Sequence, residues 1–153
     1  MSKPSTIALA HLGIATLVGM VTSFQPGVNK KFGEISGAPL HGSVVNFSVG
    51  LCVALVVAVA MKAPPPSLSK LSEGPAWMWL GGLIGATWVT AAIFLSPRMG
   101  QGNYFAAMIA GQMAAGLAID HFGLMGFEPQ RVSPIRLLGL LVIAAGVAMV
   151  RMK

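Results

Sequence analysis

The chain has 153 residues, of which 55% are hydrophobic and only 9% are charged, and its mean hydropathy is +0.77. Soluble domains carry about 25% charged residues, so this composition excludes a soluble globular protein. The net charge of +6 does not indicate a nucleic-acid partner, because the ten Lys and Arg residues are scattered along the chain instead of forming a patch. The composition predicts an integral membrane protein that is surrounded by the lipid bilayer.

Five apolar stretches, separated by the few charged residues, fill almost the whole chain. A helix needs about 20 apolar residues to cross the hydrocarbon core. The first four stretches reach that length, and the fifth reaches it if Arg136 and Arg151 extend their side chains to the two membrane surfaces. We therefore expect an all-α, polytopic membrane protein with a single domain over residues 1–153. Its transmembrane helices are expected at about 6–30, 38–61, 75–96, 101–120 and 134–151.

The connections between these helices are short. The segment 96–100, which contains Pro97 and Gly100, predicts a tight turn between the third and fourth helices. Ser133 and Pro134 are suited to the N-cap and the first position of the fifth helix. The first stretch has no cleavage site of small residues at its end, so we expect a retained helix and not a signal peptide.

In the first expected helix, polar residues stand beside a helix-breaking dipeptide. Gln25 and Asn29 are four residues apart and share a face if the helix continues past Pro26 and Gly27. An interrupted helix at membrane depth is tolerated only beside protein or a water-filled cavity. We therefore expect Pro26 and Gly27 to form a hinge, and Gln25 and Asn29 to bind substrate. The alternative is an ordinary helix end that is capped by these side chains.

The next three helices carry further candidates for a substrate path. An amide without a partner is costly in the bilayer, so Asn46 and Gln112 are expected either to bond to another helix or to line the path. Trp88 lies near the middle of its helix, where it either fills the core or forms a pocket wall that attracts a cation. Tyr104, near the start of the fourth helix, is the last candidate for a residue that lines the substrate path.

Asp120 closes the fourth helix and is the candidate for ion coupling, because acidic residues in or near membrane helices are often functional. The alternative is an ordinary charge at the membrane surface. No Asp or Glu lies deep in any stretch, which argues against a simple proton antiporter. Catalytic, metal-ligand and nucleotide motifs are also absent, so we expect neither an enzyme nor a cofactor nor a bound metal. A weaker alternative is a membrane enzyme that acts on lipid through Asp120 and His121.

With five helices, the basic residues divide evenly between the two sides of the membrane. One side holds Lys3, Lys62, Lys70, Arg131 and Arg136, and the other holds Lys30, Lys31, Arg98, Arg151 and Lys153. Orientation normally follows an excess of Lys and Arg on the cytoplasmic side, so this tie specifies orientation weakly. We expect the chain to insert both ways and to pair with a second copy as an antiparallel homodimer. The alternative is one fixed orientation.

Several segments resemble one family of membrane proteins. They are QPGVN (25–29), HGSVVNFSVG (41–50), WLGGLIGA (79–86), PRMG (97–100), GQ (111–112), IDHFGL (119–124) and RLLG (136–139). Over nearly the whole chain they are similar to the YdcZ-type, five-helix branch of the drug/metabolite transporter superfamily. The resemblance implies an inner-membrane protein that is half the size of ten-helix transporters built from two inverted repeats. The related four-helix multidrug transporters use a Glu in the first helix, and Gln25 is the nearest polar group here, so that route of proton coupling is not expected.

Together these observations predict a small-molecule transporter that exports small polar or cationic metabolites by alternating access. Two antiparallel copies would share a cavity lined by Gln25, Asn29, Asn46, Trp88, Tyr104 and Gln112. The alternative is a non-transporting subunit that stabilises or regulates a partner membrane protein, and the assembly could then be heteromeric.

Overall fold

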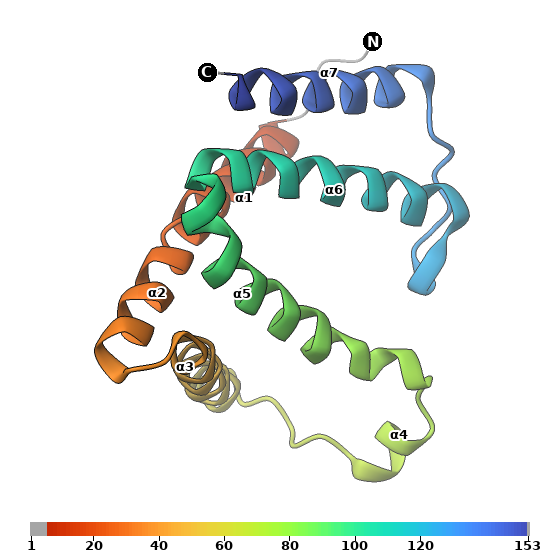
Figure 1. The fold of residues 1–153 in the computed structure, drawn as a ribbon. Helices are drawn as coiled ribbons and strands as arrows, with labels where there is room; N and C mark the ends of the chain where they lie inside the picture. The colour runs from red at the N-terminus through yellow and green to blue at the C-terminus, as the bar shows by residue number, and fades with distance from the viewer. Residues whose placement is uncertain (1–5, 153) are drawn as a thin grey trace. The chain divides into compact units, whose positions relative to one another are not determined.

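The computed structural model describes residues 6–152, and within this range it contains helices and no strand (Figure 1). Five segments of this range are long and apolar enough to cross a membrane: Thr6–Ser36, Pro39–Ala60, Ala76–Met99, Gln101–Phe122 and Pro134–Arg151. The predicted fold class is therefore confirmed. Lys3 and Lys153, which were counted in the charge balance, lie outside the described residues.

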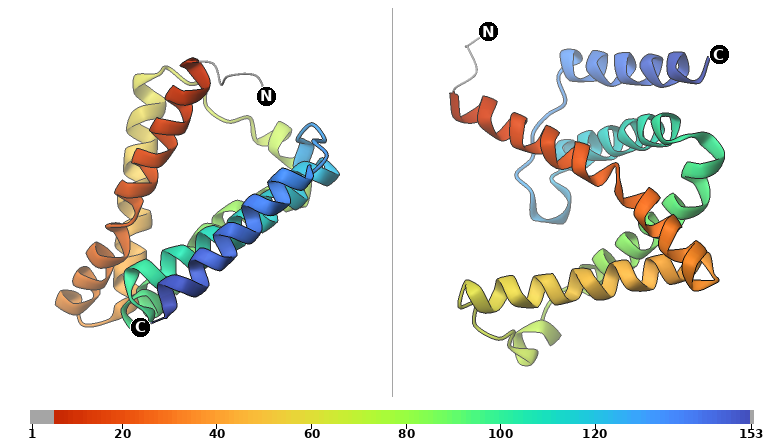
Figure 2. Two further views of the ribbon diagram at one scale, coloured as in Figure 1. Left: turned by 90° about the horizontal axis from the view of Figure 1, so that it is seen from above. Right: turned by 90° about the vertical axis from the view of Figure 1, so that its left-hand side faces the viewer.

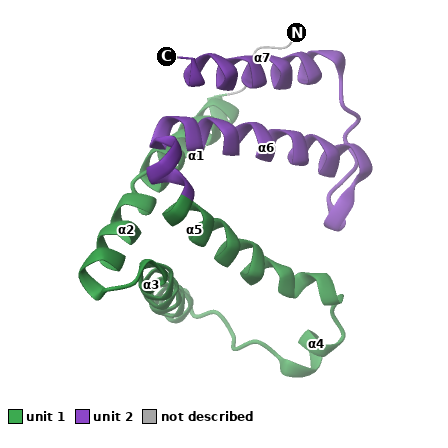
Figure 3. Cartoon of the chain, viewed as in Figure 1, with its two compact units in different colours: residues 1–94 green, residues 95–153 purple. Residues whose placement is uncertain are grey.

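The chain divides into two compact units, Met1–Phe94 and Leu95–Lys153, which we describe separately (Figure 3). The expectation of one domain over residues 1–153 stays a prediction. Unit 1 contains α1 (Thr6–Thr22), α2 (Gln25–Ser36), α3 (Pro39–Ala60), α4 (Leu68–Ser72), η1 (Ala76–Trp79) and most of α5 (Leu80–Met99). Unit 2 contains the end of α5, α6 (Gln101–Phe122), η2 (Leu124–Gly126) and α7 (Pro134–Arg151).

The first span is interrupted between α1 and α2, at Ser23 and Phe24. Pro26 lies in the first turn of α2, where a missing backbone N–H breaks no helical hydrogen bond. The expectation that this span ends near residue 30 is wrong, because α2 continues to Ser36. Within its last turns Lys30 and Lys31 form ion pairs with Glu34, at 3.4 and 3.6 Å, so the charges end the apolar stretch without ending the helix.

Close backbone contact joins α2 to α3. Gly37, with φ of +89°, ends α2 in the left-handed conformation, and α3 begins at Pro39. A Cβ atom on Gly42 would overlap the backbone of Asn29, and one on Gly33 would overlap the backbone of Pro39. These two glycines let the helix backbones touch, which is how helices in lipid pack most tightly.

In unit 2, the expectation that the third span ends at residue 96 is wrong, because α5 passes through Pro97 to Met99. The Gly100 N–H still donates to the Ser96 carbonyl oxygen at 2.9 Å, and the chain turns at Gly100, which has φ of +84°. Figures 1 and 2 show α6 and α7 side by side and antiparallel. The predicted start of α7 is confirmed: Ser133 accepts a hydrogen bond from the Arg136 N–H at 3.4 Å, and Pro134 lies in the first turn.

Candidate functional site

Three amide side chains of α2 and α3 lie close together in unit 1, and we call Gln25, Asn29 and Asn46 the amide cluster. Gln25 Nε2 donates to Asn46 Oδ1 at 2.8 Å. Asn46 thus bonds to another helix, which is one of the two roles that the sequence left open for it. The bond is possible because Gly42 brings α3 against α2 one turn before Asn46.

Asn29 is the most buried member of the amide cluster, with 5% of its surface exposed. Its Nδ2 atom has no hydrogen-bond partner among the described residues. Asn29 and Asn46 both line a cavity of about 160 Å³, whose remaining walls are Val28, Phe32, Gly42, Val45 and Val49. A buried donor without an acceptor costs about 1–3 kcal/mol, so this cavity favours a ligand or a water that brings an acceptor atom.

The remaining candidate of unit 1 is Trp88, which lies half-buried on α5. Two residues further along α5, Thr90 forms a hydrogen bond of 3.2 Å with Ser43 of α3. This bond fixes the stretch of α5 that carries Trp88 against the start of α3. A role for Trp88 in the substrate path stays a prediction.

One of several cavities in unit 2 lies on α6 and α7 and has a volume of about 290 Å³; we call it the cavity of unit 2. Gln112, Gly116 and Asp120 line it from one face of α6, because they are spaced four residues apart. Arg136 lines it from α7, and Ile109, Met113 and Leu117 supply apolar walls. Tyr104 is not in this lining; it is buried, and its ring packs edge-on against Phe105 at 5.3 Å between ring centres.

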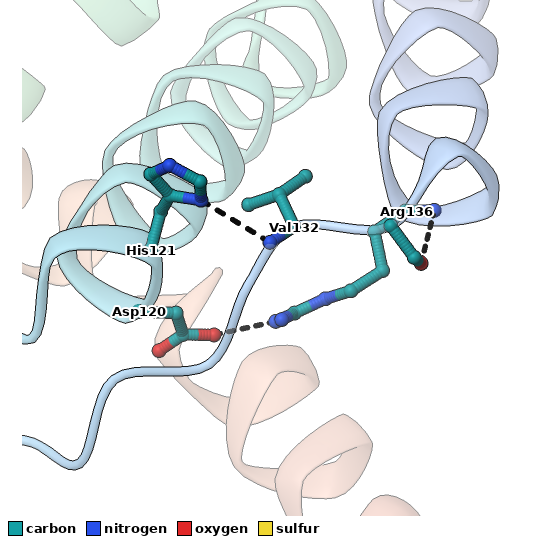
Figure 4. Close-up of polar contacts among 5 residues, drawn as sticks. Asp120, His121, Val132 and Arg136 are labelled. Carbon is teal, nitrogen blue, oxygen red and sulfur yellow. Dashed lines mark hydrogen bonds and ion pairs between the residues drawn. The ribbon is translucent and has the colours of Figure 1, made fainter.

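Asp120 and Arg136 form an ion pair at the loop end of the α6–α7 hairpin (Figure 4). The Arg136 Nη2 atom donates to Asp120 Oδ2 at 2.5 Å, and the side chains are 36% and 32% exposed, respectively. The returning loop is anchored beside the pair, where the Val132 N–H donates to His121 Nδ1 at 3.3 Å. The Gln130 N–H also donates to the Asp120 carbonyl oxygen at 2.7 Å.

These contacts give both Asp120 and His121 partners from across the loop and do not arrange them as a catalytic pair, which requires a nucleophile bonded to its base. Within residues 6–152, no three His, Cys, Asp or Glu side chains gather where they could hold a metal ion. The two cavities offer a ligand amide groups, one carboxylate and one guanidinium.

The family model described as "Putative inner membrane exporter, YdcZ" matches residues 10–149 of the chain. The chain belongs to the YdcZ family. Comparisons with curated proteins and with solved structures found no match. The resemblance stated from the sequence is confirmed, and the protein is a multi-pass protein of the inner membrane. The description of the YdcZ family names an exporter, which is a transporter and not an enzyme.

In this YdcZ-family protein, the structure brings five of the predicted residues together in two groups, which include neither Trp88 nor Tyr104. Gln25, Asn29 and Asn46 form one group, and Gln112 and Asp120 line the other cavity. Sequence reasoning missed Arg136, which it treated as a surface anchor. The signal was present, because Asp120 and Arg136 flank a loop that joins two successive helices, and such helix ends meet in an antiparallel hairpin.

Proposed function

We propose that this YdcZ-family protein exports small polar or cationic metabolites by alternating access, as an antiparallel homodimer. The observation that carries the proposal is the buried Nδ2 atom of Asn29, which lines a cavity within the membrane spans and lacks an acceptor. A purely structural amide would be bonded, as Gln25 and Asn46 are. A donor kept open in a buried cavity suits a molecule that binds and leaves.

The interruption between α1 and α2 supports alternating access. It lies two residues before Pro26 and Gly27, so the substrate-lining face of α2 follows a break in the helix. Residues 6–21 of α1 are all exposed, so α1 can reorient about this point without breaking a buried core of its own. Substrate sites of many transporters are formed by such discontinuous helices. Pro26 and Gly27 are the proposed hinge.

The odd number of spans and the even division of basic residues support the proposed homodimer. Five spans place the two ends of the chain on opposite sides of the membrane. Five Lys and Arg residues on each side leave no excess to select one orientation. Two copies in opposite orientation then reproduce the inverted repeats of ten-helix transporters.

Export is tested by comparing the small polar metabolites in the medium of cells that produce the wild-type protein, Asn29→Leu or Gln112→Leu. We expect at least one metabolite to accumulate with the wild type and to fall to the empty-vector level with Asn29→Leu. Ser48→Leu is the matched control, because Ser48 is an exposed polar residue of α3 whose hydroxyl bonds only to the Val44 carbonyl oxygen of its own helix. An unchanged metabolite profile with both variants would show that neither cavity carries substrate. If cells with the wild-type protein release no more of any metabolite than cells with the empty vector, the proposal of export is contradicted.

The antiparallel arrangement is tested by the sidedness of the C-terminus. Cys52 is a free, exposed thiol and is first replaced by Ala. A single Cys is then added at the C-terminus and labelled with a membrane-impermeant reagent, before and after cell lysis. Labelling of about half of the protein from outside supports dual insertion. All-or-none labelling would mean one orientation, and the antiparallel homodimer would give way to a parallel assembly or an oppositely oriented partner protein.

A further inference from the structure

The cavity of unit 2 is polar at two points and apolar between them. Gln112 and Asp120 are eight residues apart on one face of α6, which corresponds to roughly 12 Å along the helix axis. Ile109, Met113 and Leu117 supply apolar walls, and Gly116 adds no side chain that would fill the space. One water molecule takes up about 30 Å³ in the liquid. If each non-hydrogen atom of a ligand needs a similar volume, the cavity of 290 Å³ holds a molecule of about ten such atoms.

The charged end of this cavity has no net charge. The contact between Asp120 and Arg136 uses one carboxylate oxygen and one guanidinium nitrogen. No other side-chain partner of either group lies within residues 6–152, and both side chains are about one third exposed. One carboxylate oxygen therefore remains to accept hydrogen bonds, and several guanidinium N–H groups remain to donate them.

This neutrality determines which ligand charge suits the cavity. A molecule with net positive charge is attracted by Asp120 and repelled by Arg136, whose contacting atoms lie only 2.5 Å apart. A net anion meets the opposite combination. A molecule that carries both charges a few bonds apart can face the two groups at once, with each charge against its opposite.

We infer that the cavity of unit 2 binds a small zwitterion with an apolar body. The ammonium group faces Asp120, the anionic group faces Arg136, and the body lies along Met113 and Leu117 toward Gln112. The inference rests on the proposed export function, and it narrows the proposed substrates from polar or cationic metabolites to zwitterions. Asp120 is then a specificity residue rather than a site of ion coupling.

The test uses the purified full-length protein in detergent and three probes of nearly equal size. Leucine is the zwitterion, leucinamide the cation and isocaproate the anion. Binding is measured by calorimetry at about pH 6. Both amino groups are charged at this pH, because an α-amino group beside an amide has a pKa of about 7.7–8.0, and a neighbouring carboxylate raises the pKa of the leucine amino group further. We expect the wild type to bind leucine about tenfold more tightly than either other probe. Equal binding of the three probes, or no binding of leucine, overturns the inference.

Variants of the pair give a second readout, the charge preference itself. Asp120→Asn leaves Arg136 alone and should shift the preference to isocaproate, and Arg136→Gln should shift it to leucinamide. Because a lone charge can unfold the protein, the exchange variant Asp120→Arg/Arg136→Asp is also measured, and it should keep the preference for leucine. Arg151→Gln is the matched control, since it removes a guanidinium from the other end of α7. An exchange variant that is folded and prefers either charged probe contradicts the inference.

Efflux of the same probes from proteoliposomes separates the two proposals. Leucine binding without efflux would support the zwitterion site and contradict the proposed export function. Efflux of all three probes at one rate would keep the export function and remove the zwitterion preference. Efflux of leucine alone supports both.

Discussion

The two units handle polar groups in the membrane in different ways. In unit 1 the polar groups are neutral amides, and Asn29 is buried to 5% exposure within its span. In unit 2 they include a pair of charges beside the amide of Gln112, and Asp120 and Arg136 stay about one third exposed at the ends of their helices. An unpaired amide costs a few kcal/mol in an apolar environment, whereas an unpaired charge costs far more, so the more expensive groups are kept paired and nearer to the surface.

The units also differ in what holds their polar groups in place. The amide cluster depends on backbone contact between α2 and α3, where Gly42 meets Asn29. The ion pair depends on a loop that is fastened by side-chain and turn contacts, such as that of Val132 with His121. Unit 1 should therefore be most sensitive to added volume, and unit 2 to altered charge.

The largest effect is expected from Gly42→Ala. Its new Cβ would overlap the Asn29 backbone, so α2 and α3 must move apart, and overpacking of this kind costs about 3 kcal/mol. Thermal denaturation in detergent, followed by circular dichroism, should show a large loss of stability. Gly50→Ala is the control, because nothing lies within 4 Å of the position of its Cβ. Equal stability of the two variants would mean that the contact between α2 and α3 does not hold unit 1.

The next largest effect is expected from breaking the ion pair. Asp120→Asn or Arg136→Gln alone leaves one unpaired charge, and we expect each to cost about 2 kcal/mol, less than for a fully buried pair because both groups are partly exposed. The double variant Asp120→Asn/Arg136→Gln should be more stable than either single variant. Unfolding in increasing denaturant measures all three. A double variant that loses the sum of the two single losses would show that the charges do not interact.

Features that depend on single residues or on short local patterns were predictable from the sequence. The ends of α7 follow from Ser133 and Pro134 at one end and Arg151 at the other, and they agree with the expected 134–151. The ends near residues 30 and 96 were wrong for one physical reason. Charged residues and proline end an apolar stretch without necessarily ending a helix. The helix α2 continues past Lys30 and Lys31, which pair with Glu34, and α5 accommodates Pro97 in its last turn.

The contacts of the candidate sites could be predicted only in part. Polar residues at membrane depth were visible in the sequence, but their partners depend on how helices cross. The pairing of Gln25 with Asn46 is set by Gly33 and Gly42, whose role emerges only when α2 and α3 are placed together. For Asp120 and Arg136, the sequence indicated that the two helix ends meet across one loop, but the contact between the two side chains depends on the path of that loop, which residue spacing does not specify.

A smaller effect is expected within the amide cluster. Gln25→Leu and Asn46→Leu, measured separately and together, should give a coupling energy of about 0.6 kcal/mol, the average for polar contacts between membrane helices. Asn29→Leu should leave stability unchanged or slightly raised, since its Nδ2 atom loses no bond. Thermal denaturation of the four variants measures both. A clear loss of stability in Asn29→Leu would give Asn29 a structural role and weaken its assignment to substrate binding.

The smallest effect is expected from Glu34→Gln. This variant removes an exposed ion pair of unit 1, and comparing it with Asp120→Asn shows whether charge alone or partial burial determines the strength of an ion pair. Glu34 also pairs with cations, Lys30 and Lys31, but its side chain and that of Lys30 are about half exposed, at 49% and 52%. Such helix pairs contribute about 0.3–0.5 kcal/mol, and at 1 M salt, where screening acts within about 3 Å, the loss should disappear. The loss in Asp120→Asn should largely remain under the same conditions. If Glu34→Gln lowered stability as much as Asp120→Asn, and if salt left both losses unchanged, the difference in exposure would not explain the behaviour of the two ion pairs. The Asp120–Arg136 pair would then be no stronger than an exposed ion pair on a helix surface.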